Sequence, residues 1–170
     1  DQKEAGKVMQ RVMDELCSLH PYPGAFAAAE GLDAATVQRE EELYKVIKEA
    51  IRLHPPLIML MRRVVKPTTL KDGTYIPVGH RVMVSNAIAQ RLPEVFENPD
   101  KFDPSRWDAF NIAKLPKYSF IGFGAGIHTC MGESFAFMQV RTILSVILST
   151  YELELITPFP DADYTAIVVP

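Results

Sequence analysis

The 170-residue sequence has only two cysteines, no excess of positive charge and no long uninterrupted apolar run. Cys17 and Cys130 are too far apart for a disulfide framework, and neither belongs to a CxxC pair or a His/Cys cluster with zinc spacing. The net charge of -3 disfavours binding of nucleic acid or of an anionic membrane by the surface as a whole. It does not exclude a local patch of basic residues. No apolar run reaches the roughly 18 residues of a membrane-spanning helix. These absences indicate one globular domain in a reducing compartment, with 48% apolar residues to build a core.

Apolar residues recur every three or four positions in two segments, which predicts two amphipathic helices. The first covers residues 3–19, and we expect Cys17 to be a core residue on its buried face. The second covers residues 43–51 and ends before Pro55 and Pro56, while Asp33 is a candidate cap of a short helix between the two. Residues 132–149 are apolar on nearly every side, which predicts a helix buried on most sides.

Between these helices the pattern changes to short strands and loops. Residues 57–65 are strand-like, and residues 71–85 contain Asp72-Gly73 and Val78-Gly79 turns between strand candidates, which predicts a small antiparallel sheet. Four prolines in residues 91–122 predict an ordered loop region. Residues 151–156 alternate like an edge strand, and residues 164–169 form a last strand candidate. The predicted fold class is α+β, mainly α, with small antiparallel sheets.

The stretch "FGAGIHTCMG", residues 123–132, places Cys130 among glycines just before the apolar helix. Glycines 124, 126 and 132 permit close approach of other groups, and the N–H groups at the start of the helix favour a thiolate. Such a cysteine suits the proximal ligand of a haem. The residues alone leave two alternatives open: a buried cysteine at a glycine-rich turn, and a nucleophilic cysteine with His128 as its base.

The complete pattern F-x-x-G-x-H-x-C-x-G resembles the haem-binding signature of the cytochrome P-450 superfamily, the haem-thiolate monooxygenases. The resemblance implies that Cys130 is the axial iron ligand of haem b and that Phe123 packs beside the sulfur. Gly124, Gly126 and Gly132 would belong to the same cofactor-binding loop. His128 stands where most of the superfamily has arginine, and we expect it to hold a haem propionate.

Two weaker motifs agree with this resemblance. Glu49 and Arg52 are similar to the E-x-x-R motif of the superfamily, in which a third arginine, here Arg106 of "FDPSRW", completes a structural lock. Without the resemblance, Glu49 and Arg52 would be interpreted as an exposed ion pair. Arg62 would reach the second propionate, or else be a solvated charge at the end of a strand.

In detail the chain is most similar to the sterol 14-alpha-demethylase family, through "HPPLIMLMR", "CMGESFAFMQVRTI" and "DYTAIVV". Leu57, Met59 and Met61 alternate, so in a strand they share one face that would contact substrate. Ile167 and Val168 match the second substrate-contact segment of the family. By residue type alone, these five residues would suit a protein core equally well.

The resemblance implies that residues 1–170 are a single C-terminal haem-binding portion, without the N-terminal half and the central oxygen-activating helix. The implied partners are that missing half, in cis or in trans, an NADPH-dependent reductase and a sterol, with no nucleic acid. The reductase would dock near five cations (Lys45, Lys48, Lys114, Lys117 and Arg141). The implied location is the cytoplasmic face of the endoplasmic reticulum membrane, with the anchor outside this chain, or else an organelle complex.

The leading functional hypothesis is therefore an incomplete sterol 14-alpha-demethylase, which uses O2 and reductase electrons and is inactive as this chain alone. The alternative is a non-catalytic structural or interaction subunit derived from such an enzyme within a larger complex. A haem-binding sensor or electron carrier is a third possibility.

Overall fold

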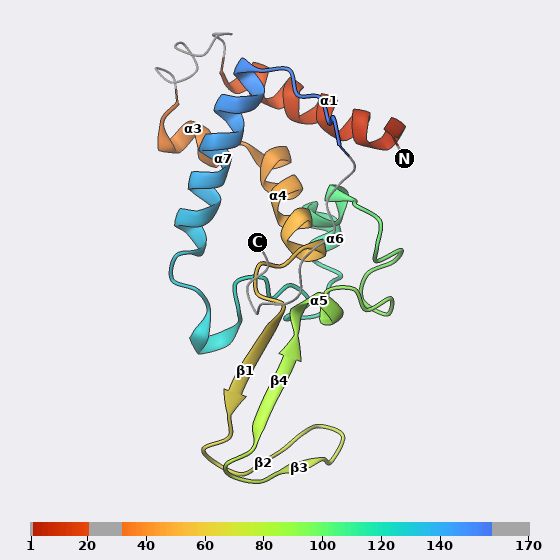
Figure 1. Cartoon of the computed structure of the whole chain (residues 1–170), viewed down its shortest axis with the longest axis vertical. Helices are drawn as coiled ribbons and strands as arrows, with labels where there is room; N and C mark the ends of the chain where they lie inside the picture. Colours follow the sequence, from red (N-terminus) through yellow and green to blue (C-terminus); the bar gives the residue numbers. More distant parts are fainter. Residues whose placement is uncertain (1, 21–31, 158–170) are drawn as a thin grey trace.

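The computed structural model describes residues 2–20 and 32–157, and its helices gather at one end of the molecule (Figure 1). The main helices are α1 (Gln2–Leu19), α4 (Glu41–Leu53) and α7 (Glu133–Thr150), with the short α3 (Ala34–Gln38) between α1 and α4. Asp33 caps α3 by accepting a hydrogen bond from the Thr36 N–H group at 2.7 Å, as the sequence predicts. α7 contacts α1, α3 and α4, so these helices form one body.

The core of this body is built by the apolar stripes of the amphipathic helices. It contains Val12 and Leu16 of α1, Leu43 and Ile47 of α4, and Phe137 of α7. Their spacing of four residues within α1 and within α4 places each pair on one helix face, as predicted. α1 also helps α4 to begin, because the Glu15 carboxylate accepts hydrogen bonds from the first N–H groups of α4.

Two predictions about burial are wrong. Cys17 is exposed, because the neighbouring Leu16 occupies the buried face of α1 and the next residue points about 100° away. α7 is not buried on most sides: among the described residues Phe135, Val140 and Ile143 are exposed. α7 packs on α1, α3 and α4 with one side only, and its other apolar side faces outward.

A polar cluster that the sequence pattern does not predict joins three elements. The Glu40 Oε1 atom accepts a hydrogen bond from the Ser145 hydroxyl at 2.8 Å and lies 2.9 Å from the His20 Nε2 atom. All three side chains are buried. The cluster therefore ties the end of α1 and the start of α4 to the middle of α7.

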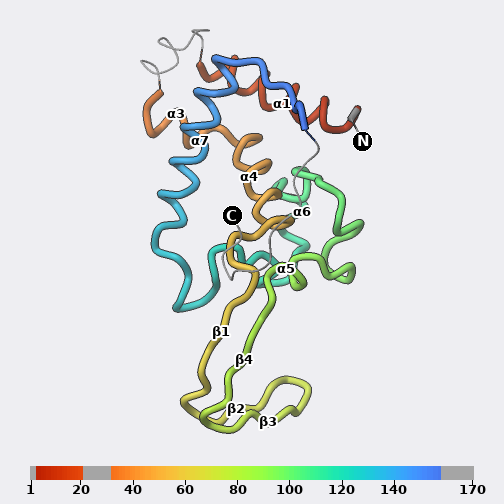
Figure 2. Tube along the Cα trace, in the orientation of Figure 1, coloured from red at the N-terminus to blue at the C-terminus, as the bar shows by residue number. Residues whose placement is uncertain are grey.

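The predicted antiparallel sheet is present as two strand pairs. β1 (Met59–Arg63) pairs with β4 (Arg81–Ser85), with Met61 opposite Met83, and β2 (Thr68–Thr69) pairs with β3 (Tyr75–Ile76). Gly73 and Gly79 lie in the predicted turns with φ of +88° and +91°, a region that glycine adopts without strain. The strands project from the helical body, as the trace in Figure 2 shows.

Residues 86–132 return from the sheet to α7, and they include the loop region predicted for residues 91–122, which also holds short helices that the sequence does not predict. The whole stretch contains α5 (Asn86–Ala89), α6 (Ala109–Ile112) and two short 3-10 helices, η1 (Pro104–Trp107) and η2 (Gly126–His128). Phe96 and Trp107 are its buried anchors. The strand predicted for residues 151–156 is wrong, since this stretch is exposed and pairs with no described strand, and the candidate at 164–169 lies outside the described residues.

Candidate functional site

The backbone of the Cys130 loop is closed by its own hydrogen bonds. The Cys130 N–H group donates to the Phe123 carbonyl at 2.8 Å, and the Thr129 N–H group donates to the Gly126 carbonyl at 3.2 Å. The Cys130 carbonyl in turn accepts from the Glu133 N–H group at the first turn of α7. The loop therefore fixes Cys130 at the N-terminal end of the long helix α7.

Two of the glycines in this loop have a backbone that disfavours a side chain. Gly124 has a φ of +80°, and a Cβ atom there would lie 3.1 Å from the His128 carbonyl oxygen. Gly126 has a φ of +67°. A Cβ atom on Gly132 would stand 3.7 Å from the Cys130 Sγ atom. These positions let the chain turn tightly beneath the sulfur and leave space beside it.

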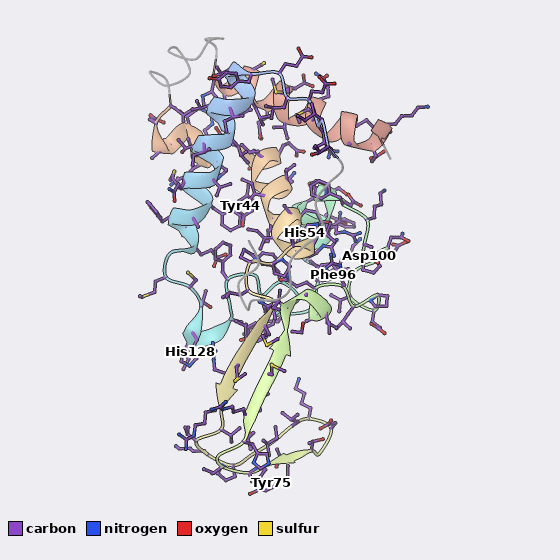
Figure 3. The ribbon with its side chains drawn as sticks, viewed as in Figure 1. Tyr44, His54, Tyr75, Phe96, Asp100 and His128 are labelled. Carbon is purple, nitrogen blue, oxygen red and sulfur yellow. The ribbon has the colours of Figure 1, made fainter. Side chains whose placement is uncertain are left out.

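The surface around Cys130 is exposed and largely apolar. Cys130 is exposed, and the side chains of Ile127 and Met131 are 95% and 102% exposed. His128 is exposed on η2, and Figure 3 shows it at the bend between the loop region and α7. The interpretation of Cys130 as a buried turn cysteine is therefore wrong. An exposed thiol on an apolar surface instead suits a flat apolar group laid over the loop.

The residues around Cys130 fit a haem better than a bare metal ion. Within residues 2–20 and 32–157, no group of three or more His, Cys, Asp or Glu side chains could hold a metal ion. An iron bound to Cys130 would therefore need its other ligands from outside the protein, as a porphyrin provides. For nucleophilic catalysis, no described hydrogen bond links Cys130 to His128 as a base.

Aromatic side chains connect the loop to the helical core. The Phe123 ring lies 5.3 Å from the Phe137 ring of α7, and that ring lies 4.7 Å from the Tyr44 ring of α4. These contacts hold Phe123 at the base of the cysteine loop.

Glu49 is the centre of a buried network that brings Arg52 and Arg106 together. Arg52 donates to both Glu49 oxygens, at 2.8 and 2.9 Å, and the Arg106 Nε atom donates to Glu49 Oε1 at 3.2 Å. The side chains of Glu49 and Arg52 are fully buried, so the interpretation as an exposed pair is wrong. The Trp107 Nε1–H group and the Asp103 backbone N–H group also donate to Glu49. The network attaches α4 to the loop region that leads to Cys130.

Two amides that the sequence analysis missed support this region from the other side. The Gln90 side chain donates to the Arg52 carbonyl at 3.1 Å and accepts from the Ile121 N–H group at 2.9 Å. The Asn86 side chain donates to the Leu57 carbonyl at 3.0 Å. Both are fully buried, but a single sequence holds no periodic signal that separates such amides from exposed ones.

The predicted substrate and propionate residues of β1 lie on opposite faces of the strand. Met59 and Met61 share one face with Met83, which β4 places opposite Met61 and which the sequence analysis missed. Leu57 precedes the strand and is exposed, as is Met61. Arg62 alternates to the other face, where it donates to the Met61 carbonyl. Ile167 and Val168 lie outside the described residues.

The five cations predicted to face a reductase differ in their surroundings. Lys45 is bound to the carboxylates of Glu42 and Asp108. Arg141 is buried and donates to the Val37 carbonyl, so its prediction as a surface cation is wrong. The other three lie over aromatic rings: Lys48 over Tyr44, Trp107 and Phe120, Lys114 over Phe110, and Lys117 over Tyr118.

Lys48 is held between rings on α4 close to α7. Its Nζ atom lies 4.5 Å from the centre of the Trp107 ring, and burial lowers the pKa of Lys48 below its ordinary value of 10.5, although the Glu133 carboxylate opposes this. A half-buried cation over aromatic rings keeps a fixed position.

Comparisons with known proteins agree with this geometry. The family model described as Cytochrome P-450 matches residues 28–170. The chain is 46% identical to the sterol 14-demethylase of Arabidopsis thaliana over 144 residues, which are 81% of this chain and 30% of that protein. It is 41% identical to the lanosterol 14-alpha demethylase of Rattus norvegicus over 127 residues, 74% of this chain and 25% of that protein. The chain thus spans less than a third of these relatives.

A solved structure shows the same fold. The heme domain of a cytochrome P-450DA mutant superposes with a TM-score of 0.84 at 20% identity, over 98% of this chain and 35% of that one. The mainly α, α+β fold with small antiparallel sheets is therefore that of a part of such a domain, as predicted. From the family match and the fold together, this chain belongs to the cytochrome P-450 family.

Proposed function

We propose that this chain is the haem-ligating portion of a sterol 14-alpha-demethylase, and that residues 1–170 form one C-terminal part of its haem domain. Cytochrome P-450 proteins carry haem, so family membership supports haem as the cofactor. The ligand assignment rests on a single observation. The Cys130 thiol is exposed at the start of α7, on a glycine-rich loop that is closed by its own backbone hydrogen bonds. Bound haem would supply oxygen activation for stepwise removal of the sterol 14-alpha-methyl group.

Each residue of the site has a defined task in this proposal. Cys130 provides the thiolate, and the α7 N–H groups stabilise its charge. Gly124, Gly126 and Gly132 would leave room for the macrocycle, and Phe123, which packs on the Phe137 ring, would lie beside the sulfur. His128 and Arg62 would hold the propionates, since an imidazole N–H group and a guanidinium both donate hydrogen bonds to carboxylates. The Glu49, Arg52 and Arg106 network keeps the proximal side in place.

The substrate assignment rests on the apolar face of β1 and on the names of the relatives. Leu57, Met59 and Met61 are apolar, and methionine adapts its shape to an irregular ligand. Together with Ile167 and Val168 they would contact the sterol. The relatives that are 41–46% identical are named as sterol, obtusifoliol or lanosterol demethylases, which supports a sterol as substrate.

In this proposal, activity requires groups from outside residues 1–170. The missing half, in cis or in trans, would cover the substrate, and a reductase would deliver electrons. The outward apolar side of α7 and the exposed substrate face suit packing against that half. The proposed location is the cytoplasmic face of the endoplasmic reticulum membrane, or an organelle complex. No helix in the described part of the chain is long and apolar enough to cross a membrane.

The decisive experiment compares two cysteine variants of the complete native protein. A reduced, carbon monoxide-bound sample should show a thiolate-type Soret band in the wild type and in Cys17→Ser, whose thiol is also exposed, but not in Cys130→Ser. A band that survives Cys130→Ser would overturn the ligand assignment. A colourless wild-type protein would instead support the non-catalytic subunit.

A second assay tests the substrate. Turnover of a 14-methyl sterol with reductase and NADPH should be measurable in the wild type and absent in Cys130→Ser. A thiolate-type spectrum without any sterol turnover would support a haem-binding sensor or electron carrier instead.

A further inference from the structure

Two fully buried amide side chains lie at α5, and the proposed function gives neither of them a task. Asn86 is the first residue of α5, and Gln90 directly follows its last residue. α5 lies where the β1–β4 pair meets the helical body (Figure 1). A buried polar side chain costs free energy unless it is hydrogen-bonded, so the partners of these amides indicate what they do.

The two amides hold both backbone polar groups of Ile121. The Gln90 Oε1 atom accepts a hydrogen bond from the Ile121 N–H group at 2.9 Å, and the Asn86 Nδ2 atom donates to the Ile121 carbonyl at 3.4 Å. The same carbonyl accepts from the Gly124 N–H group at 2.9 Å. Since Gly124 belongs to the Cys130 loop, whatever holds Ile121 in place also holds the start of that loop.

The other contacts of the two amides lead to different elements. Asn86 also donates through Nδ2 to the Leu57 carbonyl at 3.0 Å, and its backbone N–H group donates to the Ile58 carbonyl at 2.9 Å. Gln90 donates instead to the Arg52 carbonyl in α4, at 3.1 Å. Asn86 therefore joins the Cys130 loop to the start of the proposed substrate face, whereas Gln90 joins the loop to α4.

Asn86 makes both side-chain contacts through its NH2 group. Its Oδ1 atom is buried and has no hydrogen-bond partner in the described part of the chain. Among uncharged side chains, only asparagine and glutamine carry two hydrogens on one nitrogen atom. The side chain therefore acts as a double donor that holds the carbonyls of Leu57 and Ile121 at one point.

We propose that Asn86 is a positioning residue that couples sterol contact at Leu57 to the position of the Cys130 loop. The inference rests on the proposed function, because it takes Leu57 as a substrate residue. A sterol that covers the exposed Leu57 side chain would fix the backbone there, and the shared NH2 group would pass this constraint to Ile121. Coupling is reciprocal, so a fixed loop would in turn strengthen sterol binding. Substrate and iron ligand would thus be held in one frame.

The test is hydrogen exchange of the complete native protein, with and without a saturating 14-methyl sterol, read by mass spectrometry. Peptides from residues 57–63 report sterol contact, and peptides from residues 121–130 report the Cys130 loop. In the wild type the sterol should slow exchange in both segments, by about fivefold or more in the loop. Asn86→Leu has a similar volume but no NH2 group, so it should lose the protection of the loop and keep that of residues 57–63. Its affinity for the sterol should fall by the same factor.

Gln90→Met is the matched control. It removes a buried amide that holds the same Ile121 backbone, but it leaves the contact between Asn86 and Leu57 intact. It should lower stability as Asn86→Leu does, yet the sterol should still protect the loop. Circular dichroism and urea unfolding establish that both variants are folded and similarly destabilised.

Two further variants test the same coupling without changing a buried residue. Leu57→Ala and Met61→Ala each shorten an exposed apolar side chain of the proposed substrate face, so both should fold. Only Leu57 is bonded to Asn86 through its carbonyl. At saturating sterol, Leu57→Ala should therefore reduce the protection of the loop, and Met61→Ala should not.

Three results would overturn the proposal. They are loop protection that survives in Asn86→Leu, equal loss of that protection in Gln90→Met, and equal effects of Leu57→Ala and Met61→Ala. Failure of the proposed function has a different signature: residues 57–63 of the wild type would gain no protection from the sterol, which would refute the substrate assignment and this inference with it. Failure of the haem assignment is visible separately in the Soret band.

Discussion

The Arg106 Nε atom lies 3.2 Å from the Glu49 Oε1 atom, although 57 positions separate the two residues in the sequence. Arg52, Trp107 and the Asp103 backbone donate to the same carboxylate, so both of its oxygens are fully used. One buried negative charge thus joins α4 to the loop region before Cys130. Such a centre is sensitive to loss of any single partner, because the remaining charges stay buried.

Glu49→Gln should lower the free energy of unfolding by about 3–5 kcal/mol, because it leaves the Arg52 and Arg106 guanidiniums without a counter-charge. Urea unfolding of the complete native protein at pH 7 measures this, with circular dichroism as the signal. Glu41→Gln, on the exposed surface of the same helix, is the control and should change stability by about 0.5 kcal/mol or less. Equal effects of the two substitutions would contradict a central role for Glu49.

Two glycines should respond in opposite directions to alanine. A Cβ atom on Gly122 would lie 2.5 Å from the Ile51 Cγ2 atom and 2.8 Å from the Phe120 Cζ atom, so Gly122→Ala should destabilise the protein by about 1–3 kcal/mol. Gly6 stands in α1, and a Cβ atom there would have no neighbouring atom within 4 Å, so Gly6→Ala should stabilise by about 0.5–1 kcal/mol. Thermal unfolding of both variants tests the pair. A stabilised Gly122→Ala would show that Phe120 and Ile51 move aside freely.

The helices and turns follow from the sequence because their signals are local. The periodic spacing of Leu43 and Ile47 and the Asp72-Gly73 turn depend on neighbours a few positions away. The spacing of Glu49 and Arg52 on one helix face is equally local, but only the resemblance to a known family connects them to Arg106.

The predictions that fail depend on distant contacts. Whether Cys17 or Leu16 is buried depends on where α4 and α7 lie, and composition does not specify this. The exposed side of α7 and the unpaired residues 151–156 have sequences that suit burial or pairing, but the described residues offer them no partner. The buried contact of Glu40 with His20 and Ser145 joins positions up to 105 residues apart, which no periodicity can show.

Asp103 should make the stability depend on pH in the acidic range. Partial burial disfavours its charged form, but hydrogen bonds from the Ser105 hydroxyl and N–H group prevail, so the pKa of Asp103 lies below its ordinary value of 3.8. A lowered pKa in the folded state stabilises the protein above pH 3.8, and this stabilisation disappears as the pH falls through the folded-state value.

The substitutions Asp103→Asn and Ser105→Ala separate this contribution from others. Each should lower stability at neutral pH, and the difference from the wild type should shrink as the pH falls below about 3.8. The double variant should lose little more than either single variant, because the two side chains share one hydrogen bond. Urea midpoints measured across the acid range provide the data. A difference that stays constant down to the lowest pH would rule out Asp103 as the titrating group.

If a reductase docks on the side of Cys130, Lys48 should be the cation that matters most among the predicted set. It lies over the Tyr44 ring, which is joined through Phe137 to Phe123 at the cysteine loop, whereas Lys45 is already paired with two carboxylates. Lys48→Gln should slow electron transfer from the reductase by about tenfold at low ionic strength, with a smaller effect at high salt. Lys48→Arg should restore the rate because it keeps a cation over the rings.

Stopped-flow reduction measures these rates, with Lys7→Gln near the start of α1 as the control. Unchanged rates in Lys48→Gln, or a loss that Lys48→Arg does not repair, would assign Lys48 to packing rather than to docking.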